Sequence, residues 1–364
     1  MNTFGIYIHV PFCGKKCSYC DFYSLNYNKK NADLYLRAVL RNIQYYSDKT
    51  RLVDTVYFGG GTPSLLTAES IAQIIRKIRE CFRLSENAEI TLEANPNTLT
   101  PDKLRQLRDN GINRLSIGVQ SMIDSELKFL GRTHTAERAK KTVLDAAEAG
   151  FRNISCDLMI ALPNQTAESM EFSINELSSL PISHISAYIL TIEDGTPFDK
   201  PNIRDIMPGE DQTAELYLSM VKCLNKKGFT QYEVSNFAKS GFESRHNCRY
   251  WKCSDYLGIG PAAHSCYNGK RFAVMPNLQE FIDAPNQKIY ITDESPCGFE
   301  ESAMLRLRLA EGLNIGECGE KADDILKKIP TLQESGYVTY NNERIALTPK
   351  GFLMSNSIIE YLIF

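Results

Sequence analysis

The sequence lacks long runs of charge of one sign and long apolar segments. Its 41 lysines and arginines nearly balance its 44 aspartates and glutamates, so the formal net charge is −3. Proteins that bind nucleic acid neutralise phosphates with clustered basic side chains, so we expect no nucleic-acid partner. A membrane-spanning helix needs about 20 apolar residues, and no segment approaches that length. We therefore expect no transmembrane segment.

An export signal is also missing from the start of the sequence. Residues 1–10 have no basic start followed by a long apolar stretch, which a secretory signal contains. The 11 cysteines would then remain reduced, because disulfides are rare in the cytosol. Their odd number and uneven spacing also fit a disulfide framework poorly. We expect a cytoplasmic protein.

Three of these cysteines lie close together near the N-terminus. Cys13, Cys17 and Cys20 have the spacing Cys-x3-Cys-x2-Cys, directly after a strand-like run. A structural zinc site uses four ligands, usually as two separated pairs, so a zinc knuckle here would need a distant fourth ligand. Iron–sulfur clusters are also held by thiolates, normally four. Three thiolates on a 4Fe-4S cluster leave one iron open, so the spacing favours a reactive cluster over a zinc knuckle.

Apolar, β-branched runs alternate with segments of helical periodicity in the first half of the chain. We predict six strands, at Gly5–Val10, Val53–Phe58, Glu89–Ala94, Arg114–Val119, Asn153–Met159 and His184–Leu190. Strands that alternate with helices form parallel sheets with right-handed crossovers. The pattern predicts an α/β fold with a partial (β/α)6 TIM-like barrel. Functional groups of such barrels lie at the C-terminal ends of the strands.

The last part of the chain has a different pattern. We expect helices near Glu300–Leu309 and Ala322–Ile329, a hairpin of Tyr337–Asn341 and Arg344–Leu347, and a closing helix at Pro349–Leu362. This order resembles a winged helix, but the segment is not notably basic, so we interpret it as a packing domain. The chain then divides into the barrel at 1–240, a connecting segment at 241–297 and a smaller C-terminal α+β domain at 298–364.

Polar and glycine residues cluster where the predicted strands end. The run Gly59-Gly60-Gly61-Thr62-Pro63 follows the second strand and lacks the Lys-Ser/Thr of a P-loop. Glycines let the backbone approach a ligand closely, so we predict a cofactor cradle. Three further polar residues lie at or near strand ends and a fourth on a loop: Glu93, Gln120, Asp157 and Arg132. Together they suit a ligand with hydroxyls, an amine and a carboxylate.

These residues resemble those of the radical S-adenosylmethionine (SAM) superfamily. Within it, the chain resembles the family of oxygen-independent coproporphyrinogen III oxidase and the related heme chaperones, over nearly its whole length. The resemblance implies a barrel of the radical SAM type and a 4Fe-4S cluster held by Cys13, Cys17 and Cys20, with SAM chelated at the open iron. The implied SAM-binding residues are Tyr7, Gly60, Gly61, Thr62, Glu93, Gln120, Arg132 and Asp157.

Two departures separate the chain from the oxidase branch. Oxidases carry a fourth cysteine two residues after the third, where this chain has Phe22, and they have an N-terminal extension before the motif. A positive match favours the chaperones: His246-Asn-Cys-Arg-Tyr250-Trp251 has the His-Asn-x-x-Tyr-Trp signature associated with heme binding. The resemblance therefore implies heme bound by His246, Tyr250 and Trp251. Cys248 and Cys253 are alternative heme ligands.

The expected function is that of a heme chaperone, which holds heme and transfers it to an acceptor protein while carrying a SAM-bound 4Fe-4S cluster. No residue is predicted to be catalytic. The alternative is an enzyme, coproporphyrinogen III dehydrogenase, and a zinc-binding interaction module is a third interpretation. The expected partners are heme and a heme-accepting protein whose identity the sequence does not specify. A membrane-associated acceptor is compatible with this expectation.

Overall fold

A sheet of 12 strands forms the larger part of the computed structural model, which describes residues 3–364. Six strands are parallel neighbours in chain order, as the sequence predicted. They are β1 (Thr3–Val10), β4 (Asp48–Gly60), β5 (Phe82–Ala94), β6 (Arg114–Gln120), β7 (Asn153–Ile160) and β8 (His184–Ile189). Most of their side chains are buried, because helices cover one face and the interior of the curved sheet encloses the other.

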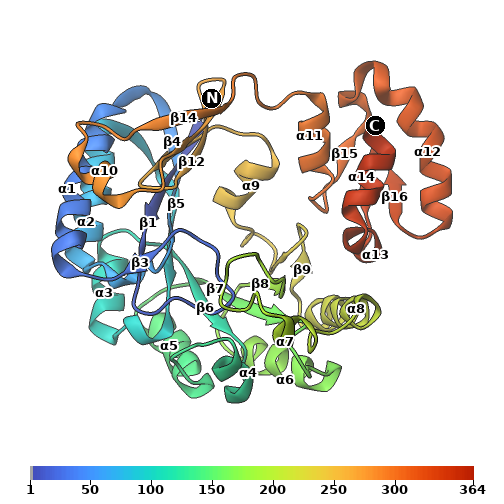
Figure 1. Ribbon diagram of the computed structural model, residues 1–364. Helices are drawn as coiled ribbons and strands as arrows, with labels where there is room; N and C mark the ends of the chain where they lie inside the picture. The colour runs from blue at the N-terminus through green and yellow to red at the C-terminus, as the bar shows by residue number, and fades with distance from the viewer. Residues whose placement is uncertain (1–2) are drawn as a thin grey trace.

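Five helices connect these strands and lie along the outer side of the curved sheet (Figure 1). They are α1 (Lys29–Tyr45), α2 (Ala68–Cys81), α3 (Pro101–Asp109), α5 (Ala136–Glu148) and α6 (Ala167–Ser178). Thr67 caps α2 by accepting a hydrogen bond from the Ser70 amide. Threonine caps the next three helices in the same way, because a threonine hydroxyl satisfies an N–H that has no partner within the helix.

The sheet extends beyond the six predicted strands at both edges. Beside β1 lie β11 (Tyr256–Ile259), β12 (His264–Tyr267), β13 (Lys270–Val274) and β14 (Ile289–Asp293); beside β8 lie β10 (Asn236–Ala238) and β9 (Thr230–Gln231). Strand β11 is parallel to β1, and the other added strands are antiparallel to their neighbours. The edge strands β14 and β9 are not neighbours in the strand order, so the barrel is open, and the predicted partial barrel is confirmed.

Further helices, strands and turns complete this part of the chain. They are β2 (Phe12–Cys13), β3 (Leu25–Asn26), α4 (Asp124–Phe129), α7 (Pro201–Arg204), α8 (Glu210–Lys226) and α10 (Leu278–Asp283), with 3-10 turns at Pro63–Leu65 and Pro96–Thr98. No helix within residues 3–364 is both long enough and apolar enough to span a bilayer.

Helix α9 (Arg245–Trp251) lies on the concave side of the sheet, away from α1 and α2 (Figure 1). The Glu89 carboxylate, in the second half of β5, accepts hydrogen bonds from the amides of Arg245 and His246, at 3.1 and 3.0 Å. A carboxylate at a helix N-terminus satisfies free N–H groups and stabilises the helix dipole. Glu89 therefore fixes α9 to β5.

The C-terminal part packs beside α9 and α8 through α11 and α13 (Figure 1). It contains α11 (Phe299–Arg306), β15 (Leu313–Asn314), α12 (Ala322–Glu334), β16 (Val338–Asn341), β17 (Arg344–Leu347), α13 (Pro349–Leu353) and α14 (Ser355–Ile363), with 3-10 turns at Ile315–Glu317 and Gly319–Lys321. The hairpin lies where the sequence predicted it. The expected single closing helix is instead two helices that meet at Met354.

Candidate functional site

The cysteine loop leaves the C-terminal end of β1 and lies against two other predicted site residues. The hydroxyl of Thr62 donates to Cys13 Sγ at 3.7 Å, and Arg132 Nη1 donates to Cys17 Sγ at 3.2 Å. Cys13 is buried, whereas Cys17 and Cys20 are half-buried. Burial and the neighbouring thiols raise the pKa of Cys20 to about 11. The loop thus presents three thiols at one end of the barrel, with a guanidinium beside one of them.

The spacing of the three sulfurs argues against a single metal ion. A tetrahedral zinc with Zn–S bonds of about 2.3 Å holds its sulfur ligands about 3.8 Å apart. The sulfurs of Cys13, Cys17 and Cys20 are not all within 4.8 Å of one another, a distance that another group of metal-binding atoms within residues 3–364 does meet. A cluster distributes its thiolates over separate irons, so the wider spacing suits a 4Fe-4S cluster better than the zinc knuckle.

The glycine run is tied to the cysteine loop by its backbone. The amide of Gly61 donates to Val10 O at 2.9 Å, and the amide of Thr62 donates to Phe12 O at 2.7 Å. A Cβ on Gly61 would lie 2.6 Å from Phe12 O, and Gly60 has a φ of +105°. Neither position tolerates a side chain. The glycines therefore let the end of β4 pack directly against the loop that carries the cysteines.

Glu93 lies beside this turn, and the pKa of its carboxyl is raised. Its Oε1 accepts a hydrogen bond from the Tyr57 hydroxyl at 2.8 Å, and the Gly60 amide also contributes a hydrogen bond. Burial nevertheless raises the pKa of Glu93 to about 7, with a further contribution from Asp157. A cation bound here would favour the ionised carboxylate, so the site suits a ligand with an ammonium group.

The three remaining polar residues are Gln120 at the end of β6, Asp157 within β7 and Arg132 on the loop after α4. Arg132 Nη2 donates to Gly118 O at 2.6 Å, and a Cβ on Gly118 would contact both Arg132 and Gln120 at 3.1 Å. Burial raises the pKa of Asp157, which accepts a hydrogen bond from Ser116 at 3.1 Å. Arg132 Nε is buried and has no hydrogen-bond partner within the described residues, which is consistent with a polar ligand at this position. Gln120 has a φ of 74°, a strained conformation of the kind that concentrates at functional sites.

The residues predicted to bind heme lie on α9, and both ring nitrogens of His246 already have hydrogen-bond partners. His246 is fully buried, its Nδ1 lies 2.8 Å from the Thr55 hydroxyl, and its Nε2 lies 2.9 Å from the Tyr250 hydroxyl. Burial and nearby arginines lower the pKa of His246 to about 3, so the ring is neutral. Trp251 is half-buried and hydrogen-bonds Glu233.

Aromatic rings bring the two predicted sites together inside the barrel. The ring of Tyr57 stacks on His246 with centroids 5.2 Å apart, and Tyr7 stacks on both, at 6.2 and 6.4 Å. The Tyr7 hydroxyl is 3.1 Å from His9 Nδ1, and burial, followed by the nearby Glu93, raises the Tyr7 pKa. The ring contacts of Tyr7 and Tyr57 therefore join the residues predicted to bind SAM to the residues predicted to bind heme.

Sequence reasoning missed Thr55, Tyr57 and Glu89. The first two alternate along β4 with the buried Val56 and Phe58, and they share a face with Gly59. That alternation places them on the interior side of the barrel, so it could have identified them. Nothing local indicates that Glu89 contacts α9, because more than 150 residues separate the two.

Comparisons with known proteins identify the family. The sequence model of the Radical SAM superfamily matches residues 7–177, and that of the HemN C-terminal domain matches residues 299–354. The chain is 34% identical to the heme chaperone HemW of Lactococcus lactis over 97% of this chain and 96% of that protein. It is 31% identical to HemW of Mycobacterium tuberculosis over 100% of this chain and 95% of that protein.

A solved structure shows the same fold. Coproporphyrinogen III oxidase (HemN) from Escherichia coli aligns with a TM-score of 0.82 and 23% identity, covering 100% of this chain and 90% of that one. At this identity the match is a likeness of fold alone. The near-complete matches to the heme chaperones agree with the branch predicted from Phe22 and His246. The chain therefore belongs to the radical SAM superfamily and, within it, to the HemW family.

Proposed function

We propose that the protein is a heme chaperone, which binds heme and transfers it to an acceptor protein. The observation that carries this proposal is the identity of 31–34% to proteins named heme chaperone HemW, over 97–100% of the chain. Phe22, at the position where the oxidases carry a fourth cysteine, is 62% exposed and contributes no thiol to the loop. This difference supports the chaperone over the oxidase.

The cofactors of the superfamily are a 4Fe-4S cluster and SAM, and the residues at the barrel end fit both. Cys13, Cys17 and Cys20 would hold the cluster, which supplies an open iron at which SAM binds. The carboxylate of Glu93 would accept a hydrogen bond from the SAM amino group, and its pKa of about 7 leaves it ready to ionise beside a cation. Arg132 contacts Cys17 Sγ and would stabilise its negative charge. The remaining residues predicted to bind SAM would line the same pocket: Tyr7, Gly60, Gly61, Thr62, Gln120 and Asp157.

Heme binding is proposed at α9, through His246 with Tyr250 and Trp251 beside it. His246 Nε2 is within hydrogen-bond distance of Tyr250, so ligation of iron by this nitrogen breaks that interaction. Substituting Tyr250→Phe frees Nε2, and if His246 is the ligand, the Soret band is retained. Substituting His246→Ala then shifts the Soret band and weakens heme retention. An unshifted band in His246→Ala assigns the ligand elsewhere, and Cys248→Ser and Cys253→Ser test the alternative thiols.

One experiment separates the chaperone from the oxidase. The protein is reconstituted anaerobically with iron and sulfide, titrated with heme, and incubated with coproporphyrinogen III and SAM under reducing conditions. The proposal predicts stoichiometric heme retention and no conversion of coproporphyrinogen III. Decarboxylation well above a cluster-free control would overturn the chaperone in favour of coproporphyrinogen III dehydrogenase.

We further propose a cytoplasmic location, a heme-binding acceptor and a division of the chain into three parts. All 11 cysteines are free, which is compatible with the cytoplasmic location that we propose. The acceptor is a heme-binding protein, and a membrane-associated one is compatible with the proposal. We also retain the division into 1–240, 241–297 and 298–364, although the segment 241–297 contributes β11 to β14 to the same sheet as the barrel.

A further inference from the structure

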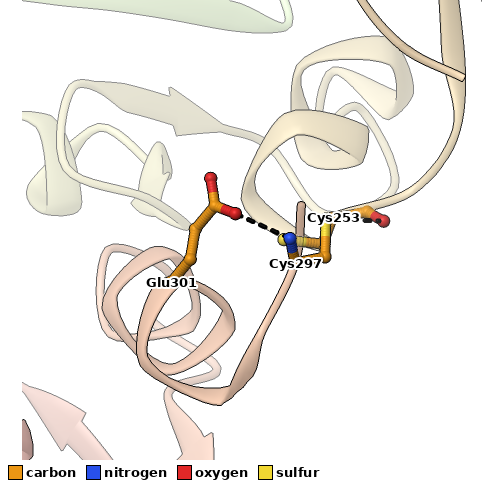
Figure 2. Close-up of side chains that lie close together, drawn as sticks. All are labelled: Cys253, Cys297 and Glu301. Carbon is orange, nitrogen blue, oxygen red and sulfur yellow. Dashed lines mark hydrogen bonds between the residues drawn. The ribbon is translucent and has the colours of Figure 1, made fainter. Parts of the chain in front are cut away.

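Three cysteines outside the radical SAM motif converge beside a carboxylate at the junction of α9, β12 and α11. Cys253 follows α9, Cys266 lies in β12, and Cys297 lies in the loop before α11. Glu301, in the first turn of α11, lies beside Cys253 and Cys297 (Figure 2). We propose that Cys253, Cys297 and Glu301 form a second metal site, which binds one zinc ion, with the Cys266 thiol next to it.

The distances suit a single ion. The metal-binding atoms of Cys253, Cys297 and Glu301 all lie within 4.8 Å of one another. Cys266 Sγ lies 3.8 Å from Cys297 Sγ but is not within 4.8 Å of all three of these atoms, so it is a neighbour of the site and not a ligand. The sulfurs of Cys13, Cys17 and Cys20 do not all lie within 4.8 Å of one another. The described residues therefore include two sets of cysteines with different geometry, one suited to a cluster and one to a single ion.

The surroundings organise the ligands. Glu301 Oε2 accepts a hydrogen bond from the Cys297 amide at 2.7 Å, and the Ser302 hydroxyl donates to Cys253 Sγ at 3.7 Å and to Cys297 O at 3.0 Å. Arg271 forms an ion pair with Glu301, which would offset part of the negative charge of two thiolates and a carboxylate. Such outer partners orient ligands in metal sites.

The backbone is strained at two of the proposed zinc ligands, Cys253 and Cys297. Cys253 has a φ of 49° and Cys297 a φ of 68°, in the left-handed region that non-glycine residues seldom adopt. These strained conformations turn the two thiols toward each other's segments, since Cys297 Sγ lies 3.7 Å from Cys253 O. Strain of this kind persists where the surroundings or a ligand hold it.

The ligand chemistry selects the metal. Thiolate-rich tetrahedral sites favour zinc over magnesium or calcium, which prefer oxygen ligands. Cys253, Cys297 and Glu301 would fill three positions of a tetrahedral ion and leave the fourth to water. The ion would join the end of α9 to α11, the first helix of the C-terminal part, and thereby hold that part against the barrel.

Zinc stoichiometry tests the proposal on the full-length protein with its cluster reconstituted, because a filled cluster removes Cys13, Cys17 and Cys20 as competing zinc ligands. After anaerobic incubation with Zn²⁺ and passage over a chelating resin, we expect about one zinc per chain, measured alongside iron. Cys253→Ser or Cys297→Ser removes a ligand and should weaken zinc affinity on the order of 100-fold or more, whereas Cys266→Ser removes a neighbouring thiol and should weaken it about tenfold or less. Cys318→Ser is the matched control, since Cys318 is a buried free cysteine outside the group.

Cobalt provides a readout that does not depend on folding of the variants. Co²⁺ bound by the unsubstituted protein should show thiolate-to-cobalt charge-transfer absorption and the d–d bands of a tetrahedral ion, and equimolar Zn²⁺ should displace both. Absence of these bands in the reduced, cluster-loaded protein would overturn the proposal. So would a Cys266–Cys297 disulfide found by anaerobic peptide mapping together with zero zinc, or undiminished zinc in Cys297→Ser.

Discussion

The hydroxyl of Tyr57 donates a hydrogen bond to Glu93 Oε1 across 2.8 Å. The same tyrosine ring stacks on His246 with centroids 5.2 Å apart. Tyr57 thus connects the carboxylate proposed to bind SAM with the histidine of the heme signature. A substitution at Glu93 or at His246 can therefore affect the other residue through Tyr57.

Removing the Tyr57 hydroxyl should weaken SAM binding. Tyr57→Phe keeps the ring on His246 but deletes a hydrogen bond that favours ionised Glu93. A hydrogen bond to a charged group contributes about 1.5–3 kcal/mol, so we expect SAM affinity at pH 7 to fall roughly tenfold or more. Anaerobic calorimetry of the cluster-loaded protein measures this. Tyr290→Phe, at an exposed tyrosine of β14, should leave the affinity unchanged; equal losses in both variants would contradict the role of Tyr57.

SAM affinity should also depend on pH through Glu93. The pKa of this carboxyl is about 7, raised from 4.5 mainly by burial, so it is protonated below pH 7 and ionised above it. A hydrogen bond from the amino group of iron-bound SAM favours the ionised form. Affinity should therefore be higher above pH 7 and fall toward tenfold per unit as the pH drops below 7.

The variant Glu93→Gln is the control for this dependence. It cannot ionise, so its SAM affinity should be lower at pH 8 and flat between pH 6 and pH 8. A pH dependence that survives in Glu93→Gln must come from another group, and this result would exclude Glu93 as the titrating residue.

The three cysteines of the N-terminal loop should each be essential for the cluster. Alanine at Cys13, Cys17 or Cys20 removes one of three thiolates, and we expect loss of the brown chromophore after anaerobic reconstitution. Cys81→Ala, at a buried free cysteine of α2, should keep full iron content. Reconstitution of four irons per chain in the triple alanine variant would show that the cluster is held elsewhere.

Glu89 should stabilise the protein through α9. Glu89→Ala removes the acceptor of two backbone hydrogen bonds and leaves the buried His246 amide without its partner. An unsatisfied buried donor costs about 1–3 kcal/mol, so the midpoint of thermal unfolding should fall. Glu86, exposed on the same strand, is the comparison: Glu86→Ala should change stability by less than about 0.5 kcal/mol. Equal midpoints for the two variants would contradict the capping role.

The sequence predicted the barrel well because its strands are long, apolar and bounded by helices with threonine caps. Strand β11 was missed because it has four residues and includes Gly258, so it carries no pattern of its own. It is defined by pairing with β1, which lies about 250 residues earlier. Long-range pairing of this kind leaves no local signal.

The site was predicted in part for the same reason. The cysteines, the glycine run and Glu93 form contiguous motifs, and the structure places most of the corresponding residues at one end of the barrel. The burial of His246 could not be predicted, because Thr55 and Glu89 reach it from distant strands. The convergence of Cys253, Cys297 and Glu301 depends on a chain reversal through three antiparallel strands.

The parallel pairing of β1 with β11 has a consequence for how the chain assembles. Until the ribosome has released residues 256–259, one edge of β1 has no partner. An unpaired edge of an apolar strand is a template for aggregation, and contacts of high sequence separation form slowly. The nascent barrel therefore spends most of its synthesis with the strand that leads into the cysteine loop exposed on one side. A chain truncated at residue 240 retains that edge permanently, and we expect it to accumulate as insoluble protein.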